Sequence, residues 1–150
     1  MNIRPYADPD WEAVRDIYDL SKPDEMRGSV DITAVIPLDQ DTAGLALFRD
    51  SVILVASDAD QVTGFGGYKG NYIAWLFVHP AHRRKGVARA LLKEIMGRLR
   101  GAVTLNVGSE NHAARKLYAG LGFIIEREFT GRFNGHHVAV LRLKYEDTAG

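Results

Sequence analysis

The distribution of apolar and polar positions divides the chain into strand-like and helix-like segments. Residues 51–57 and 72–78 are short apolar runs bounded by turn residues, which is typical of buried strands. Residues 72–78 are apolar on both faces, so they predict a central strand covered from both sides. Residues 86–100 instead place Val87, Leu91 and Leu99 on one face with a helical period. This segment is the strongest helix prediction in the chain.

Weaker patterns complete the predicted order. Residues 1–4 indicate a short strand, and Asp8 followed by Pro9 predicts the start of a helix whose apolar face carries Trp11, Val14 and Tyr18. Prolines and glycines interrupt residues 21–50, where one or two short helices are expected. Further strands are predicted at 62–69, 102–107, 123–129 and 138–145, with a helix that begins after Ser109 or Asn111. The order predicts one α/β (α+β) domain over residues 1–150.

Composition narrows the possible partners. The chain is 46% apolar and 25% charged, as in soluble globular proteins, and its 19 basic and 19 acidic residues balance. No overall field attracts nucleic acid or a membrane, so neither partner is expected. The chain has no cysteine, and its five histidines lack an HExxH spacing, so no metal is expected. The longest apolar run is too short to span a bilayer, and the first residues do not resemble a secretory signal. A cytoplasmic protein is expected.

Three cations precede a glycine between a predicted strand and the strongest helix. The first N–H groups of a helix have no intrahelical acceptor, and Gly86 leaves them open to a ligand. Arg83, Arg84 and Lys85 add positive charge, so the segment predicts an anion site at the carboxyl end of a strand. The alternative is a basic helix start that is only solvated. A Walker loop is excluded because valine follows Gly86.

Two stretches resemble a known family. RRKGVA, residues 83–88, is similar to the Gln/Arg-x-x-Gly-x-Gly/Ala signature of the GCN5-related N-acetyltransferases, the GNAT family. ENHAARKLYAGLGF, residues 110–123, resembles the second motif of that family: an asparagine, a helix, a tyrosine and then Leu-Gly-Phe. The motifs lie in the family's order, one helix and one strand apart. The resemblance is good over residues 52–123, whereas the remainder fits in outline.

The resemblance implies a fold and a cofactor. The fold is a mixed, mostly antiparallel sheet, flanked by helices, in which the parallel strands 72–78 and 102–107 splay apart. Acetyl-CoA would lie in the gap as acyl donor, and its pantetheine amides would pair with backbone around Phe77 and Val78. Its pyrophosphate would meet the backbone of Arg83, Arg84, Lys85, Gly86, Val87 and Ala88. Asn111 is either a helix cap or a cofactor contact, and both roles are compatible.

Tyr118 has two interpretations. It shares an apolar stripe with Ala114 and Leu121, which is sufficient to explain it as a core residue. By resemblance to the family, its hydroxyl instead protonates the departing thiolate of the cofactor, a role that suits a phenol with an ordinary pKa of about 10. The catalytic interpretation is favoured.

The base that deprotonates the acceptor amine is not evident. Many relatives carry a glutamate on the central strand, but residues 72–78 contain no carboxylate and no histidine. Bulk water or a side chain could accept the proton, and the candidates are Glu25, Asp31, Tyr72, His79 and His137. The resemblance to the family implies that the acceptor lies between residues 21–42 and 130–137. Acidic residues in the first segment could attract a cationic amine: Asp24, Glu25, Asp31, Asp39 and Asp41.

The sequence therefore predicts an acetyl-CoA-dependent N-acetyltransferase. The amine of a small molecule would attack the thioester directly in a ternary complex. The alternatives are a protein or peptide N-acetyltransferase and a non-catalytic acyl-CoA-binding sensor. An exposed strand near the C-terminus would permit a homodimer through edge pairing.

Overall fold

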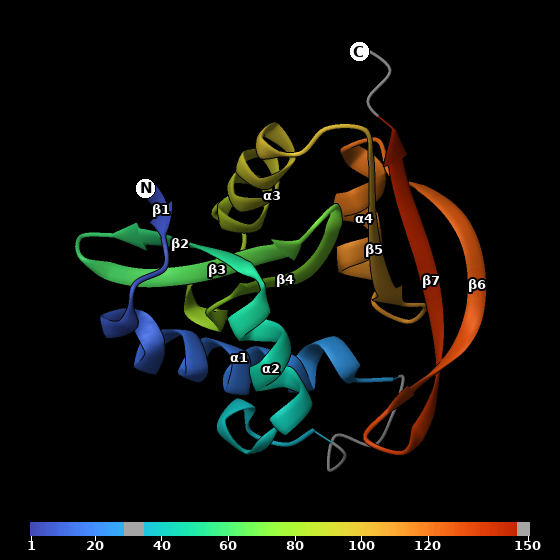
Figure 1. Ribbon diagram of the computed structural model, residues 1–150, viewed down its shortest axis with the longest axis horizontal. Coiled ribbons are helices and arrows are strands. Elements are labelled where there is room, and N and C mark those ends of the chain that lie inside the picture. The colour runs from blue at the N-terminus through green and yellow to red at the C-terminus, as the bar shows by residue number, and fades with distance from the viewer. Residues whose placement is uncertain (29–34, 147–150) are drawn as a thin grey trace.

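A computed structural model describes residues 1–28 and 35–146. Its elements follow the predicted order closely (Figure 1). The helices are α1 (Trp11–Met26), α2 (Thr42–Asp50), α3 (Val87–Arg98) and α4 (His112–Gly120). The strands are β1 (Asn2–Pro5), β2 (Val52–Asp58), β3 (Gln61–Lys69), β4 (Tyr72–Val78), β5 (Ala102–Gly108), β6 (Ile124–Phe133) and β7 (His136–Glu146).

The strands form one mixed sheet in the order β1-β2-β3-β4-β5-β7-β6. Only β4 and β5 run parallel among these neighbours, and α3 makes the crossover between them. All the other neighbouring strands are antiparallel. The predicted α/β architecture, with a central parallel pair in a mostly antiparallel sheet, is confirmed.

Helices cover both faces of the sheet. Figure 1 shows α1 and α2 below β2–β4 and α3 above them. Alternate residues of β2 face the two layers: Leu54 packs in the cluster with α3 and α4, whereas Ile53 and Val55 pack in the cluster with α1 and α2. The strand β4 between these layers is therefore covered from both sides, as its sequence predicts.

The parallel pair is joined at one end only. β4 and β5 pair at Tyr72 with Thr104 and at Ile73 with Leu105. Tyr68 of β3 pairs with Ile73, but the preceding Gly67 pairs with Trp75, so Ala74 is an extra residue in β4. This bulge lies where the pairing with β5 ends. Beyond it β4 and β5 diverge.

The bulge also changes the face to which β4 side chains point. Ile73 packs in the α3 and α4 layer, whereas Trp75 and Phe77 pack in the α1 and α2 layer. Residues two apart on a regular strand share a face, so the change between Ile73 and Trp75 needs the extra residue. The splay is therefore built into β4 itself.

The first helix corrects two sequence expectations. A break near residue 21 is wrong, because α1 continues through Pro23 to Met26. Tertiary contacts stabilise the last turns: the Ser21 hydroxyl donates to the Val78 carbonyl, and Asp24 pairs with Arg83. The helix begins at Trp11 after a 3-10 turn, and Asp8 does not cap it.

Asp10, rather than Asp8, is the acidic residue that secures the start of α1. Its carboxylate accepts a hydrogen bond from the Ala7 N–H and forms a bidentate pair with Arg4 at 2.7 and 2.9 Å. The Arg4 guanidinium lowers the pKa of Asp10, although burial opposes this.

The C-terminal hairpin forms the far edge of the sheet. β6 and β7 are joined by a tight turn at Asn134 and Gly135, both with positive φ, as the sequence predicts. β6 is an edge strand on which Ile124 and Ile125 are exposed. A homodimer through this edge stays a prediction. In the described part of the chain, no helix combines the length and hydropathy that a membrane span requires.

Candidate active site

A cavity of about 630 Å³ lies between the last turns of α1, the segment from β4 to α3, and α4. We call it the loop cavity. Every predicted cofactor-binding residue lines it except Lys85. Its lining residues are Ser21, Asp24, Glu25, Leu76, Phe77, Val78, His82, Arg83, Arg84, Gly86, Val87, Ala88, Arg89, Asn106, Val107, Asn111, Ala113, Ala114, Leu117 and Tyr118.

The start of α3 presents backbone to the loop cavity. Gly86 is the N-cap residue of α3 and has a φ of +79°, in the left-handed region that favours glycine. A Cβ at Gly86 would meet no protein atom within 4 Å. Because Gly86 lines the cavity, the space beside it is open to a ligand. The unpaired N–H groups of the first turn of α3 give this end of the cavity a partial positive charge.

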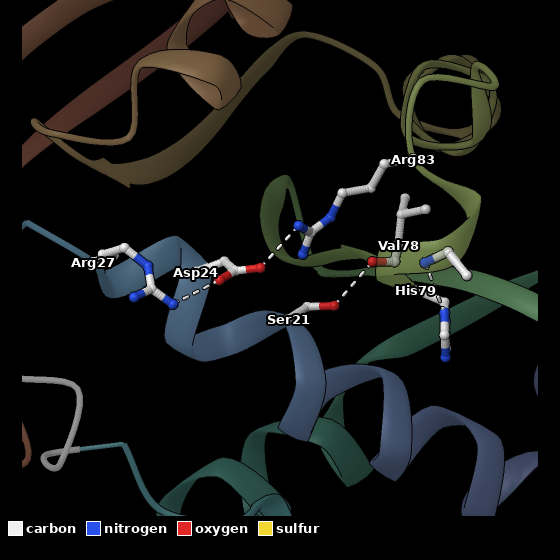
Figure 2. A network of polar contacts seen from close by, with 7 residues as sticks. Ser21, Asp24, Arg27, Val78, His79 and Arg83 are labelled. Carbon is white, nitrogen blue, oxygen red and sulfur yellow. Dashed lines mark hydrogen bonds and ion pairs between the residues drawn. The ribbon is translucent and has the colours of Figure 1, made fainter.

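An ion pair ties α1 to this segment. Arg83 Nη1 lies 2.8 Å from Asp24 Oδ2, and Arg27 pairs with the same carboxylate at 2.9 Å (Figure 2). Hydrogen bonds from Arg83 and then Arg27 lower the pKa of Asp24. Asp24 is therefore engaged by two guanidinium groups at the rim of the cavity.

The free edge of β4 faces the gap left by β5. The His79 N–H donates to the Thr63 carbonyl of β3 at 2.8 Å. By strand alternation, the backbone groups of Phe77 also face β3, whereas those of Leu76 and Val78 face the gap. The Val78 carbonyl already accepts a hydrogen bond of 2.9 Å from the Ser21 hydroxyl (Figure 2). The Val78 N–H and both Leu76 backbone groups are thus directed into the gap between β4 and β5.

Tyr118 belongs to the core and to the site. It is buried, and its ring meets Phe123 edge-on at 5.7 Å between centroids. It also lines the loop cavity. Burial raises the pKa of its hydroxyl, and the charge of Glu25 raises it further. The phenol is therefore protonated at neutral pH. Asn111 likewise combines two positions, since it lines the cavity and its side chain accepts from the Ala114 N–H as the cap of α4.

A second cavity, of about 420 Å³, adjoins the first, and we call it the sheet cavity. It lies among α1, β4, β5 and the β6–β7 hairpin. Glu25, Leu76, Phe77, Asn106, Val107 and Tyr118 line both cavities. Its other lining residues are Lys22, Met26, Tyr72, Ile73, Ala74, Trp75, Leu105, Gly108, Phe129, Gly131, Arg132, Phe133, Val138 and Val140. The two cavities therefore meet at Tyr118 and Glu25.

The structure separates the candidate bases. Glu25 lines both cavities, and Tyr72 lines the sheet cavity, where burial raises the pKa of its hydroxyl. His79 lines a different cavity and its Nδ1 accepts from the Ala81 N–H (Figure 2). His137 lines neither of the two cavities. Asp31 lies outside the described residues.

The remaining acidic candidates lie apart from the site. Asp41 caps α2 by accepting from the Gly44 N–H, and Asp39 lines neither the loop cavity nor the sheet cavity. Among the acidic residues of the first acceptor segment that the structure describes, Glu25 alone lines the sheet cavity.

Sequence reasoning missed Lys22. Its ammonium lies 3.1 Å from Glu25 Oε2 and within 6 Å of three ring centroids, those of Tyr18, Phe77 and Phe133. Tyr18, Lys22 and Glu25 have a helical spacing, but the expected break near residue 21 concealed it. A helix continued past Pro23 would have placed all three on one face.

Metal ligands are not grouped in the described ranges. Within residues 1–28 and 35–146, no set of three His, Asp or Glu side chains is placed to hold a metal ion.

Solved structures share this fold. The GCN5-related N-acetyltransferase of Rhodopseudomonas palustris aligns at a TM-score of 0.81 with 20% identity, over 97% of this chain and 94% of that one. The structure of yncA of Salmonella typhimurium, solved with its cofactor acetyl-CoA, aligns at a TM-score of 0.72 with 20% identity. The alignment covers 97% of this chain and 93% of that one. The structure of Arabidopsis thaliana NAA60 in complex with a bisubstrate analogue aligns at a TM-score of 0.73 with 20% identity, over 99% of each chain.

The sequence itself matches a family. The match covers residues 11–123 and therefore spans α1 to the end of the second motif, including both edges of the splay and the whole Gly86 segment. It takes in Glu25 and Tyr118, where the two cavities meet. The chain therefore belongs to the acetyltransferase (GNAT) family, whose members are acyltransferases.

Proposed function

We propose that this protein transfers an acetyl group from acetyl-CoA to the amine of a small molecule, by direct attack in a ternary complex. The observation that carries the proposal is the junction of two cavities at Tyr118 and Glu25. One cavity suits the donor and the other suits the acceptor. The reacting atoms of both can therefore meet without a covalent enzyme intermediate.

The loop cavity fits the donor. The Val78 N–H and the Leu76 backbone groups face the gap, where pantetheine amides can complete the hydrogen bonding that β5 does not provide. The first N–H groups of α3 and the space beside Gly86 suit a pyrophosphate. Arg83 and Arg84 lie on the same wall and add charge. Bound there, acetyl-CoA supplies a thioester whose acetyl group can pass to an amine.

Tyr118 is placed to serve the leaving group. As the new C–N bond forms and the C–S bond breaks, the sulfur gains the electron pair of the broken bond. Tyr118 lines both cavities, and we propose that its hydroxyl gives its proton to that sulfur. A backbone N–H at Val78 can polarise the thioester carbonyl.

Glu25 is placed to serve the acceptor. Glu25 lines both cavities, and its charge acts on Tyr118 and Tyr72. An alkylammonium must lose a proton before nitrogen can attack, and Glu25 is the carboxylate available at the junction among the described residues. In this proposal Glu25 provides from α1 the carboxylate that many relatives carry on the central strand. This position favours turnover over the alternative of a sensor that only binds acyl-CoA.

An acetyl-CoA turnover screen tests the proposal. Free thiol is measured with amino acids, polyamines, aminoglycosides and short peptides as acceptors, and acetyl-CoA binding is measured by calorimetry. Turnover with at least one small amine is expected. Turnover with peptides alone would support the peptide-acetylating alternative, and binding without turnover on any acceptor would support the sensor.

A further inference from the structure

Glu25 carries a buried oxygen that lacks a hydrogen bond. The Lys22 ammonium lies 3.1 Å from Glu25 Oε2 and compensates its charge, but the geometry makes no hydrogen bond to this atom. A buried oxygen in this condition costs free energy until a donor reaches it. Because Glu25 lines the sheet cavity, the N–H of an acceptor amine can be that donor.

The charges of the sheet cavity compensate each other. Lys22 pairs with Glu25, and its ammonium also lies 5.6 and 5.3 Å from the ring centroids of Phe77 and Phe133. Strand alternation places the Arg132 side chain on the face of β6 opposite to Phe133, so its guanidinium points away from the cavity. The part of the chain that the structure describes thus offers no free cation there. An acceptor with an acidic group would have to bury that charge unpaired.

The β6–β7 hairpin presents an apolar face to the sheet cavity. Phe129, Gly131 and Phe133 of β6 line the cavity together with Val138 and Val140 of β7. Gly131 pairs with Val138 and Phe129 pairs with Val140, so strand alternation places all five residues on one face of the hairpin. We call this face the hairpin wall. It carries no polar side chain, so an apolar group gains most by contact with it.

The backbone conformation of Gly131 does not require a glycine. Gly131 lies inside β6, and its φ is outside the left-handed region. A glycine at such a position weakens a strand. A Cβ there would lie 3.1 Å from Val140 Cγ2 and 3.6 Å from Phe129 Cε2, so a larger side chain would crowd both or project into the cavity. The glycine therefore lets the cavity reach the backbone of β6 between Phe129 and Phe133.

We infer that the acceptor is a primary amine with an apolar body, an arylalkylamine or an alkylamine, and that Gly131 limits the size of that body. The inference rests on the proposed acetyltransferase function and names its substrate class. The amine donates to Glu25 Oε2, and the body lies against the hairpin wall. Transfer forms the amide C–N bond and breaks the C–S bond, so the products are the N-acetylated amine and the free thiol of CoA.

A homologous series of amines tests the apolar body. Ethylamine, butylamine and hexylamine have nearly the same amine pKa, so differences in kcat/KM report the binding of the alkyl chain. Thiol release from acetyl-CoA is measured for each. Every methylene that is buried against the hairpin wall should raise kcat/KM by about threefold to fourfold.

A matched pair of amines tests the exclusion of an acidic group. Phenylalanine differs from phenethylamine by one carboxylate, and its amine loses a proton more readily, so intrinsic reactivity favours phenylalanine. A preference for phenethylamine must then come from binding. We expect kcat/KM for phenethylamine to exceed that for phenylalanine by at least about tenfold, and spermidine to be as poor as phenylalanine.

Variants of the hairpin wall test the role of Gly131. Gly131→Val should lower kcat/KM for hexylamine and phenethylamine by roughly tenfold and leave that for ethylamine within about twofold. Gly131→Ala is the milder variant and should act in the same direction. Ala139→Val is the matched control, because Ala139 is exposed on the opposite face of the hairpin and lines neither cavity. Thermal unfolding and acetyl-CoA calorimetry verify that each variant folds and binds the donor.

Each outcome decides between the claims. A rise of kcat/KM along the alkyl series that is reduced in the Gly131 variants, but not in Ala139→Val, supports the inference. Short amines, phenylalanine or spermidine that react as well as hexylamine and phenethylamine overturn the acceptor class and leave the acetyltransferase proposal intact. A preference for apolar amines that neither Gly131 variant changes overturns the role of Gly131. Acetyl-CoA binding without turnover on any compound overturns both the acceptor class and the transferase function.

Discussion

The loop cavity and the sheet cavity are built in different ways. Half of the residues that line the loop cavity come from one continuous segment, from β4 to the first turn of α3, and its functional groups include backbone N–H groups and a glycine. The sheet cavity gathers side chains from α1, β4, β5, β6 and β7. A backbone site tolerates change in most side chains, whereas a side-chain site changes its chemistry with each substitution. The comparison therefore predicts that donor binding changes little with most side-chain substitutions, whereas acceptor specificity changes readily.

Among the substitutions that test this comparison, one at Gly86 is expected to have the largest effect. Gly86→Asn places a side chain in the open space that suits a pyrophosphate. Loss of two hydrogen bonds to a charged group should raise the Kd for acetyl-CoA by about a hundredfold or more. Calorimetry measures the change.

Gly135→Asn provides the matched control for Gly86. Gly135 also has a positive φ and open space around its Cβ position, but it lies in the β6–β7 turn. Both variants should lose similar stability in thermal unfolding, since asparagine tolerates a positive φ. Undiminished acetyl-CoA binding by Gly86→Asn would contradict a backbone site at the start of α3.

Tyr118→Phe should give the next largest effect, on the rate alone. Removal of the proton donor should lower kcat by about a hundredfold and leave the Kd for acetyl-CoA unchanged. Burial raises the pKa of Tyr118 above its ordinary value of 10.0, so the hydroxyl should stay protonated throughout the neutral pH range. Titration of Tyr118 should therefore cause no fall of kcat within that range. Steady-state kinetics across pH measure both.

The control for Tyr118 is Tyr145→Phe. Tyr145 also packs against Phe123, at 5.6 Å between ring centroids, but it lines neither cavity. An equal loss of kcat in Tyr145→Phe and Tyr118→Phe would mean that the hydroxyl of Tyr118 has only a packing role.

Glu25→Gln tests the junction from the acceptor side. Because solvent can also accept the proton of the amine, a smaller loss is expected, about tenfold in kcat/KM for the acceptor at neutral pH. The deficit should shrink as pH rises and more of the amine is already deprotonated. Glu94→Gln, on the exposed face of α3, serves as control. A deficit that does not depend on pH would contradict the role of Glu25 as base.

The smallest effects are expected at the ion pair on the rim of the loop cavity. Asp24 and Arg83 are each about two-fifths exposed, so the pair should contribute about 1 kcal/mol or less to stability. Arg83→Gln should weaken acetyl-CoA binding a few-fold, and Asp24→Asn should strengthen it a few-fold by freeing Arg83. Calorimetry at low ionic strength measures both. Changes of the same sign in the two variants would contradict a competition between Asp24 and the ligand for Arg83.

The same ion pair has a defined pH dependence. Arg83 lowers the folded pKa of Asp24 below its ordinary value of 3.8. The stability that the pair contributes is therefore present at neutral pH and down to that ordinary value. It is lost as pH falls further, through the lowered folded pKa. Asp24→Asn should consequently change the free energy of unfolding at pH 7 and have almost no effect below the folded pKa.

The sequence predicted the structure best where neighbouring residues determine it. The bounds of β4, the cap at Asn111 and the turn at Asn134 and Gly135 follow from short-range patterns of hydrophobicity, capping and turn residues. Part of the lining of the loop cavity was predicted for a similar reason, because these residues lie in two short motifs: Arg83, Arg84, Gly86, Val87, Ala88, Asn111 and Tyr118.

Long-range contacts explain what the sequence did not predict. Nothing near Pro23 in the chain indicates that Val78 and Arg83 will hold the last turns of α1. The bulge at Ala74 is equally concealed, since residues 72–78 are apolar throughout and an extra residue becomes visible only from the register with β3. Lys22 and Phe133 are likewise far apart in the sequence, and only the fold brings the Lys22 ammonium to 5.3 Å from the Phe133 ring centroid.

The β6–β7 hairpin contributes to one of the two cavities and not to the other. Phe129 and Phe133 of this hairpin line the sheet cavity, whereas none of its residues in the described ranges lines the loop cavity. Under the proposed function, substitution of these two side chains should alter which amines are accepted and leave acetyl-CoA binding unchanged. Specificity could then evolve through single positions of the hairpin while its pairing with β5 is kept.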